Sequence, residues 1–403
     1  PQYNKKSGWQ GCNLTEINGG KCNTEEDFYK ACRAASILGT LQAGYTDFKF
    51  LTDTSKLIFD REALLGVSIT GWMNNPDILF NERVLQKGAE IVKEVNKEVA
   101  KVIGINAAAR TTCVKPSGNA SVLLQTASGI HAEHSNMYIR NVQMNKESEI
   151  TQAIMKTNPY MVEDSVWSAG GTDVVVSFPI LPKKGSLYKD DLLGVKHLEL
   201  VKKAQKYWVE AGTNEDLCAD KGVRHNVSNT IIVDDWDNVE RYVFENRHSF
   251  AGISFLAMSG DKDYNQAPNT AVITAKDMVK KYGNAAIFAS GMVVDALKVF
   301  NNLWDACATA KGFGEDISLE TSENAMKRDW IRRFKKFGDN YLNSDSDVAE
   351  HCLKDAYLLH KWNKIQSTLK TVDWKEDIKE RKYTDVDTLA AAACAGGACE
   401  IDF

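Results

Sequence analysis

Two cysteines near the end of the chain have the spacing for thiol chemistry. Cys394 and Cys399 lie five positions apart, with Gly396 and Gly397 between them. Glycine permits a tight turn at little steric cost, so the two sulfurs can come close enough for a disulfide. A dithiol on an exposed arm suits thiol–disulfide exchange with a distant site and with an external reductant. The alternative is a pair of incidental cysteines in an alanine-rich end.

The segment 115–121, which reads Lys-Pro-Ser-Gly-Asn-Ala-Ser, indicates a turn from a strand into a helix. Ser117, Asn119 and Ser121 offer side-chain oxygens, and the start of a helix offers free backbone N–H groups and a favourable dipole for an anion. The segment is therefore a candidate phosphate site, although it lacks the Lys-Ser/Thr ending of a Walker motif. An ordinary capped helix start explains the local pattern equally well.

A third cysteine, Cys12, lies in the strand-like segment Gly-Cys-Asn-Leu-Thr-Glu-Ile of residues 11–17. A single cysteine in such a strand is more often a small core residue than a reactive one. The nine cysteines are odd in number and irregularly spaced, which favours reduced, intracellular thiols over a disulfide framework. No Cys-X2-Cys pair is present, so the sequence predicts no zinc site and no other metal ligands.

The composition is that of a globular protein. Of 403 residues, 43% are hydrophobic and 26% are charged, and the formal net charge is −5 with the basic residues scattered. Scattered basic residues argue against a nucleic-acid partner. The longest apolar run, 285–294, is far shorter than the about 20 residues that span a bilayer. With no signal peptide recognisable, we expect a cytoplasmic protein without a membrane partner.

Alternating and β-branched runs predict strands near 64–72, 110–114, 137–144, 173–180, 230–233 and 252–258. Three- and four-residue periodicity predicts helices near 25–47, 80–102, from 119, 195–212 and 236–247. Helical crossovers between strands favour a largely parallel α/β fold. Beyond about residue 275 the pattern becomes helical. We therefore expect an α/β region over 1–275, a helical region over 276–382 and a flexible tail over 383–403.

Taken together, the motifs resemble the large catalytic subunit of ribonucleotide reductases. The resemblance rests on the Cys12 strand, the turn at 115–121, the tail cysteines and several further segments, namely Thr-Ala-Ser-Gly-Ile-His at 126–131, Tyr-Ile-Arg-Asn-Val at 138–142, Ser-Asn-Thr at 228–230, Glu-Asn-Arg at 245–247, Phe-Ala-Gly-Ile-Ser-Phe at 250–255 and Gln-Ala-Pro at 266–268. The chain is most similar to the adenosylcobalamin-dependent members. One alternative is a reductase that uses a separate ferritin-like radical subunit, but those relay the radical through paired tyrosines and Tyr383 stands alone. Another is a non-catalytic phosphate-binding redox fragment.

This resemblance implies a fold and roles for particular residues. The fold would be the second half of a ten-stranded α/β barrel with a helical C-terminal appendage. Cys12 would be one member of the active-site pair that reduces the ribonucleotide, with adenosylcobalamin as cofactor. Cys394 and Cys399 would re-reduce that pair and would in turn be reduced by thioredoxin or glutaredoxin. The substrate phosphates would be held by Ser117, Gly118, Asn119, Ala120 and Ser121.

One motif of the family does not occur in this sequence. An Asn-X-Cys-X-Glu finger loop should precede the Cys12 strand, its cysteine forming the thiyl radical and its glutamate acting as general base. None of the nine cysteines stands in such a motif. We therefore expect the chain to be the C-terminal portion of a reductase, to require a missing N-terminal fragment as partner, and to be inactive without it.

Overall fold

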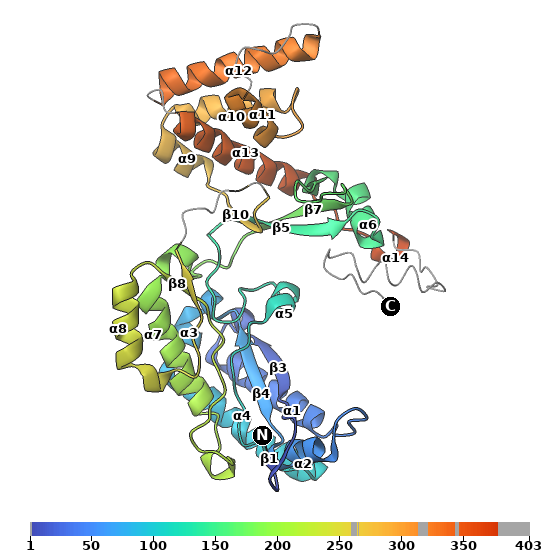
Figure 1. Cartoon of the computed structure of the whole chain (residues 1–403), viewed down its shortest axis with the longest axis vertical. Helices are drawn as coiled ribbons and strands as arrows, with labels where there is room; N and C mark the ends of the chain where they lie inside the picture. The colour runs from blue at the N-terminus through green and yellow to red at the C-terminus, as the bar shows by residue number, and fades with distance from the viewer. Residues whose placement is uncertain (1, 259–263, 265, 313–320, 343–345, 378–403) are drawn as a thin grey trace. The chain divides into compact units, whose positions relative to one another are not determined.

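The computed structural model (Figure 1) describes residues 2–258, 264, 266–312, 321–342 and 346–377. The chain folds into two compact units. The first comprises Pro1–Asn136 and Pro182–Gly260, and the second comprises Met137–Leu181 and Asp261–Phe403. This division differs from the expected boundary at residue 275, because a stretch from the middle of the α/β region joins the helical unit.

The first unit contains short strands with helices between them. Its strands are β1 (Gln2–Tyr3), β2 (Lys6–Ser7), β3 (Asn13–Asn18), β4 (Leu65–Thr70), β8 (Ile231–Val233) and β9 (Phe255–Ala257). Its helices are α1 (Glu25–Ala43), α2 (Asp53–Glu62), α3 (Pro76–Leu79), α4 (Glu82–Ile103), α5 (Gly118–Leu123), α7 (Gly194–Ala204) and α8 (Trp236–Glu245). A π-helical turn, Gln205–Glu210, continues α7.

Five extended segments of this unit lie side by side and parallel. β3 pairs with β4 from Asn13 opposite Leu65 to Asn18 opposite Thr70. On its other side β4 bonds to the segment 110–114, where Cys113 N donates to Val67 O at 3.0 Å. That segment in turn bonds to the stretch 226–233, where Ser228 N donates to Val114 O at 2.9 Å. The stretch ends in β8, which pairs in parallel with β9.

The helices of the first unit bury one face each. Thr24 closes a capping box at the start of α1. Asn81 caps α4, which ends at Gly104 in the left-handed conformation. α1 packs on β3, β4 and α4, and α4 also packs on the π-helical turn. The resulting core is apolar and fully enclosed, and its largest side chains include Phe28, Trp72 and Trp208.

The second unit combines an antiparallel sheet with a helical bundle. Its strands are β5 (Tyr138–Asn145), β6 (Val162–Asp164), β7 (Asp173–Ile180) and β10 (Asn269–Ala271), in the order β10-β5-β7-β6. Its helices are α6 (Glu149–Thr157), α9 (Ala275–Tyr282), α10 (Ala285–Ala296), α11 (Leu303–Gly312), α12 (Ser322–Tyr341), α13 (Ser346–Thr368) and α14 (Trp374–Asp377). The expectation of a largely parallel arrangement is wrong for this sheet, whose neighbours are all antiparallel. The apolar run of β7 reflects its central position and its contact with α13.

Aromatic and small side chains form the core of the helical bundle. Trp330 and Phe334 of α12 stack with ring centroids 5.5 Å apart and pack against α10 and α13. Ala289 and Val293 of α10 are buried in the same cluster. No helix in the described part of the chain is both long enough and apolar enough to cross a bilayer.

Candidate functional site

Cys12 lies immediately before β3 on a face that it shares with a second thiol. Its neighbour strand carries Gly66, and a Cβ atom built on Gly66 would lie 2.7 Å from Cys12 Sγ and 3.0 Å from Cys113 Sγ. Both sulfurs are close to the same point, so they lie less than about 6 Å from each other. Gly66 therefore leaves the space over which the thiols of Cys12 and Cys113 converge.

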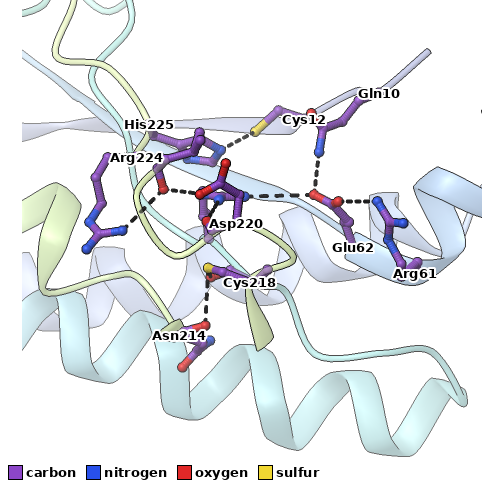
Figure 2. Close-up of polar contacts among 12 residues, drawn as sticks. Gln10, Cys12, Arg61, Glu62, Asn214, Cys218, Asp220, Arg224 and His225 are labelled. Atoms are coloured by element: carbon purple, nitrogen blue, oxygen red, sulfur yellow. Dashed lines mark hydrogen bonds and ion pairs between the residues drawn. The ribbon is translucent and has the colours of Figure 1, made fainter. Parts of the chain in front are cut away.

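His225 is the polar neighbour of Cys12 (Figure 2). Its Nε2 lies 3.9 Å from Cys12 Sγ, and its Nδ1 lies 3.0 Å from the carbonyl oxygen of Thr112. Burial lowers the pKa of His225 to about 4, so the imidazole is neutral at physiological pH. Burial also raises the pKa of the Cys12 thiol to about 11, although the charge of Lys115 opposes this rise. Both groups therefore rest in their uncharged forms.

A buried ion pair fixes the loop that carries His225. Arg110 Nη1 lies 3.8 Å from Glu62 Oε2, and both side chains are almost fully enclosed. Arg110 also donates to the carbonyl oxygens of Val223 and Asp220, each at 2.9 Å. Gln10 and Arg61 donate to Glu62 from the other side, as Figure 2 shows. The strand at 110–114 is thus tied to the loop immediately before His225.

The turn at 115–121 is held from β3 by Glu16. Ser117 Oγ donates to Glu16 Oε1, and Ser68 Oγ donates to the same oxygen at 3.3 Å. Lys115 N donates to Ser68 Oγ at 2.9 Å, which joins the turn to β4. Burial raises the pKa of Glu16, while the hydrogen bonds from the two serines lower it. Ser117 has a φ of 57°, a left-handed conformation that is costly for a non-glycine residue.

The predicted phosphate residues are placed together but use their side chains differently from the expectation. The hydroxyl of Ser117 is bonded to Glu16 and does not cap α5, and Ser121 Oγ donates to Gly118 O at 2.7 Å. Gly118, Asn119 and Ala120 are exposed at the first turn of α5. The first N–H groups of a helix have no partner within that helix. The first turn of α5 therefore has backbone N–H groups without a partner inside the helix, while the hydroxyls of Ser117 and Ser121 are bonded to other groups of the protein.

Several neighbours of Cys12 were not identified from the sequence, namely Glu16, Gly66, Cys113 and His225. Alternation along the strands was a usable signal for two of them, because residues 12 and 16 of one strand must share a face. Cys113 and Lys115 alternate in the same way along the segment that bonds to β4 on the side away from β3. His225 had no local signal, since it lies in a loop without periodicity. Cys394 and Cys399 lie outside the described residues.

No cluster of metal ligands is present in the described ranges: no three or more His, Cys, Asp or Glu side chains are arranged to hold a metal ion. The donor set around Cys12 consists of thiols, one imidazole and the more distant Glu16.

Comparisons with known proteins agree with the motifs. No model of a known protein family matches the chain. Over 205 residues, 49% of the chain, it is 28% identical to the probable adenosylcobalamin-dependent ribonucleoside-triphosphate reductase of Dictyostelium discoideum. It is 25% identical over 206 residues to the adenosylcobalamin-dependent ribonucleoside-triphosphate reductase of Euglena gracilis. The aligned regions make up 26% and 27% of those two proteins, so the chain spans about a quarter of their length.

A solved structure shows the same fold. The crystal structure of a B-12 dependent (class II) ribonucleotide reductase superposes on this chain with a TM-score of 0.54 and 17% sequence identity. The superposition covers 67% of this chain and 39% of the chain in the crystal structure. This match confirms the expected α/β class. The ten-stranded barrel is not confirmed, since the sheets of the described residues have two or four strands. In sequence, about half of the chain is similar to adenosylcobalamin-dependent ribonucleoside-triphosphate reductases, as its motifs indicated.

Proposed function

We propose that this chain supplies the reducing thiol and the phosphate turn of an adenosylcobalamin-dependent ribonucleotide reductase. The observation that carries the proposal is the geometry of β3. Cys12 and Glu16 alternate on one face of that strand, and Glu16 holds Ser117 of the turn. Four residues of a strand span roughly 13 Å, which is comparable to a ribonucleotide from its sugar to its terminal phosphates. One ribonucleotide could therefore contact both the thiol and the turn.

The proposed reaction replaces the 2′ hydroxyl of the ribose by hydrogen. The hydroxyl leaves as water, and two thiols lose their hydrogens and become one disulfide, so the two electrons taken up by the sugar come from the sulfurs. Cys12 provides one of these thiols. Its burial suits this role, because a thiol with a pKa of about 11 keeps its hydrogen at neutral pH. The tail pair Cys394 and Cys399 would reduce the disulfide by exchange and would be regenerated by thioredoxin or glutaredoxin.

Several partners belong to the proposal. Adenosylcobalamin, which the names of the two relatives specify, would supply the radical, and the steps assigned to this chain use its own side chains only. These names favour cobalamin over a ferritin-like radical subunit. Because no Asn-X-Cys-X-Glu motif occurs in the sequence, a polypeptide with that motif would have to complete the site. The five parallel segments of the first unit would then form one half of a ten-stranded barrel.

The test is complementation. The chain should be mixed with a reductase fragment that carries the Asn-X-Cys-X-Glu segment, together with adenosylcobalamin, a ribonucleoside triphosphate and a dithiol, and deoxyribonucleotide should be measured. We expect product only from the mixture, and none when Cys12→Ser replaces the wild type. The matched control is Cys352→Ala, a buried cysteine in the helical unit, which should retain activity. Full turnover by the isolated chain, or by the Cys12→Ser mixture, would contradict the proposal.

A further inference from the structure

His225 is oriented by a fixed partner on each side of its ring. Nδ1 lies 3.0 Å from Thr112 O, and a carbonyl oxygen can only accept, so Nδ1 carries the ring hydrogen. The neutral ring then has its lone pair on Nε2, the atom that lies 3.9 Å from Cys12 Sγ. The carbonyl oxygen of Thr112 thus selects the tautomer that can accept a proton from the thiol.

The position of His225 is built into the fold. Gln205 Nε2, in the π-helical turn, donates to His225 O at 3.2 Å. The side chain of Trp208 in the same turn donates to Cys113 O at 3.0 Å. One irregular turn therefore supports the backbones that carry the imidazole and the second thiol. Irregular turns of this kind inside helices are frequent at functional sites.

Burial keeps both members of the pair neutral, and nearby charges modify their pKa values. Besides burial, the charges of Arg110 and Lys115 lower the pKa of His225. Lys115 also lowers the pKa of Cys12, against the stronger effect of burial. On the face that it shares with Cys12, Cys113 has a pKa raised by burial and by Cys12, and Glu16 adds to that rise. An S–H donor consequently faces a free nitrogen acceptor, which is the arrangement for proton transfer during a reaction.

We propose that His225 Nε2 accepts the proton of Cys12 when this thiol attacks a disulfide. The S–H bond of Cys12 breaks, its electron pair forms the new S–S bond, and the attacked disulfide releases one sulfur as a thiolate. The proton passes to Nε2 and from the imidazolium to that leaving thiolate, or to water where the leaving thiolate is too weak a base to take it. The inference concerns the cysteine used in the proposed function. It does not require reductase activity, because any accessible disulfide is a substrate for this step.

The test is the pH dependence of Cys12 exchange with an aromatic disulfide whose leaving thiolate absorbs visible light. Peptide mapping assigns the mixed disulfide to Cys12, and Cys12→Ser gives the background. Between about pH 6 and pH 9 the wild-type rate should be nearly constant, because His225, with a pKa of about 4, stays neutral. Without a base, the rate should rise about tenfold per pH unit, following the thiolate fraction of a group with a pKa of about 11.

The matched variant is His225→Asn. Its side-chain amide can still donate to Thr112 O, but it has no basic nitrogen near Cys12. We expect at least a tenfold lower rate at about pH 7, a rise with pH that approaches the wild-type rate near the thiol pKa, and partial rescue by added imidazole. A pH profile of His225→Asn that matches the wild type would overturn the proposal. If His225→Asn does not unfold cooperatively, the pH profile of the wild type is the test by itself. A tenfold rise of the wild-type rate per pH unit also overturns the proposal.

Discussion

The convergence of two thiols over Gly66 can be tested with the substitution Gly66→Ala. The added Cβ would lie 2.6 Å from Leu14 Cδ2, 2.7 Å from Cys12 Sγ and 3.0 Å from Cys113 Sγ, so at least one of these side chains must move. Overpacking of this kind costs about 1–3 kcal/mol. The loss of glycine freedom in the unfolded chain returns about 0.4–1 kcal/mol. We expect the free energy of unfolding to fall by about 1–2 kcal/mol.

The assay is denaturant-dependent labelling of Cys32, which is buried in the core of the same unit and so reports its unfolding. The double variant Gly66→Ala with Cys12→Ala should recover part of the loss, because one of the clashing sulfurs is gone. Gly222→Ala is the control. Its Cβ would meet only Asp220 Oδ1, at 3.5 Å, and should change stability by less than about 0.5 kcal/mol. Wild-type stability of Gly66→Ala would refute the convergence of Cys12 and Cys113.

Three further predictions concern buried histidine, buried carboxylate and the tail. His197 Nε2 donates a hydrogen bond to Ile130 O, 2.9 Å away, and burial lowers its pKa to about 4. The unfolded chain therefore takes up the proton first, and the free energy of unfolding should fall from about pH 6.5 to about pH 4, less steeply in His197→Gln. For Glu16 the stability changes with pH in the opposite direction, because burial raises its pKa in the folded protein. The wild type should therefore lose stability relative to Glu16→Gln as the pH rises above the ordinary glutamate pKa, and an acid titration of the unfolding free energy of both proteins would show this. In the complemented enzyme, replacing Cys394 and Cys399 by serine should abolish thioredoxin-driven turnover and leave a single turnover, measured as deoxyribonucleotide per chain.

Local pattern predicted most individual elements. The apolar positions of α4 recur at helical spacing, and Asn81 and Gly104 mark its two ends, so both existence and length could be read from the sequence. The fully buried run of β4 was also recognisable. The pairing of the strands was harder to predict from the sequence. β7 has the composition of a parallel strand, yet its neighbours are antiparallel, because a central strand is apolar whatever the direction of its partners.

The candidate site shows the same limit. Cys12 and the turn at 115–121 could be singled out because their residue types suggest chemistry at their own positions. His225 is distant from both in sequence, and its place beside Cys12 depends on hydrogen bonds that Arg110 makes to the carbonyl oxygens of the preceding loop. Hydrogen bonds from side chains to irregular backbone leave no periodic pattern in the sequence. Such a neighbour is found only once the fold is known.

Burial gives Cys12 a property that favours one half of its proposed cycle and opposes the other. A thiol with a pKa of about 11 holds its hydrogen, which suits donation to a reacting sugar. Reduction of its disulfide by a tail dithiol favours the opposite, because Cys12 is then released as a thiolate, and a thiolate of high pKa is a poor leaving group. A positive charge closer than that of Lys115 would ease the second step by lowering the pKa of Cys12 further, but it would weaken the first. A neutral imidazole held at 3.9 Å avoids this conflict, since it leaves the resting thiol protonated and, in the reverse of the proposed proton transfer, returns a proton to Cys12 as the S–S bond breaks.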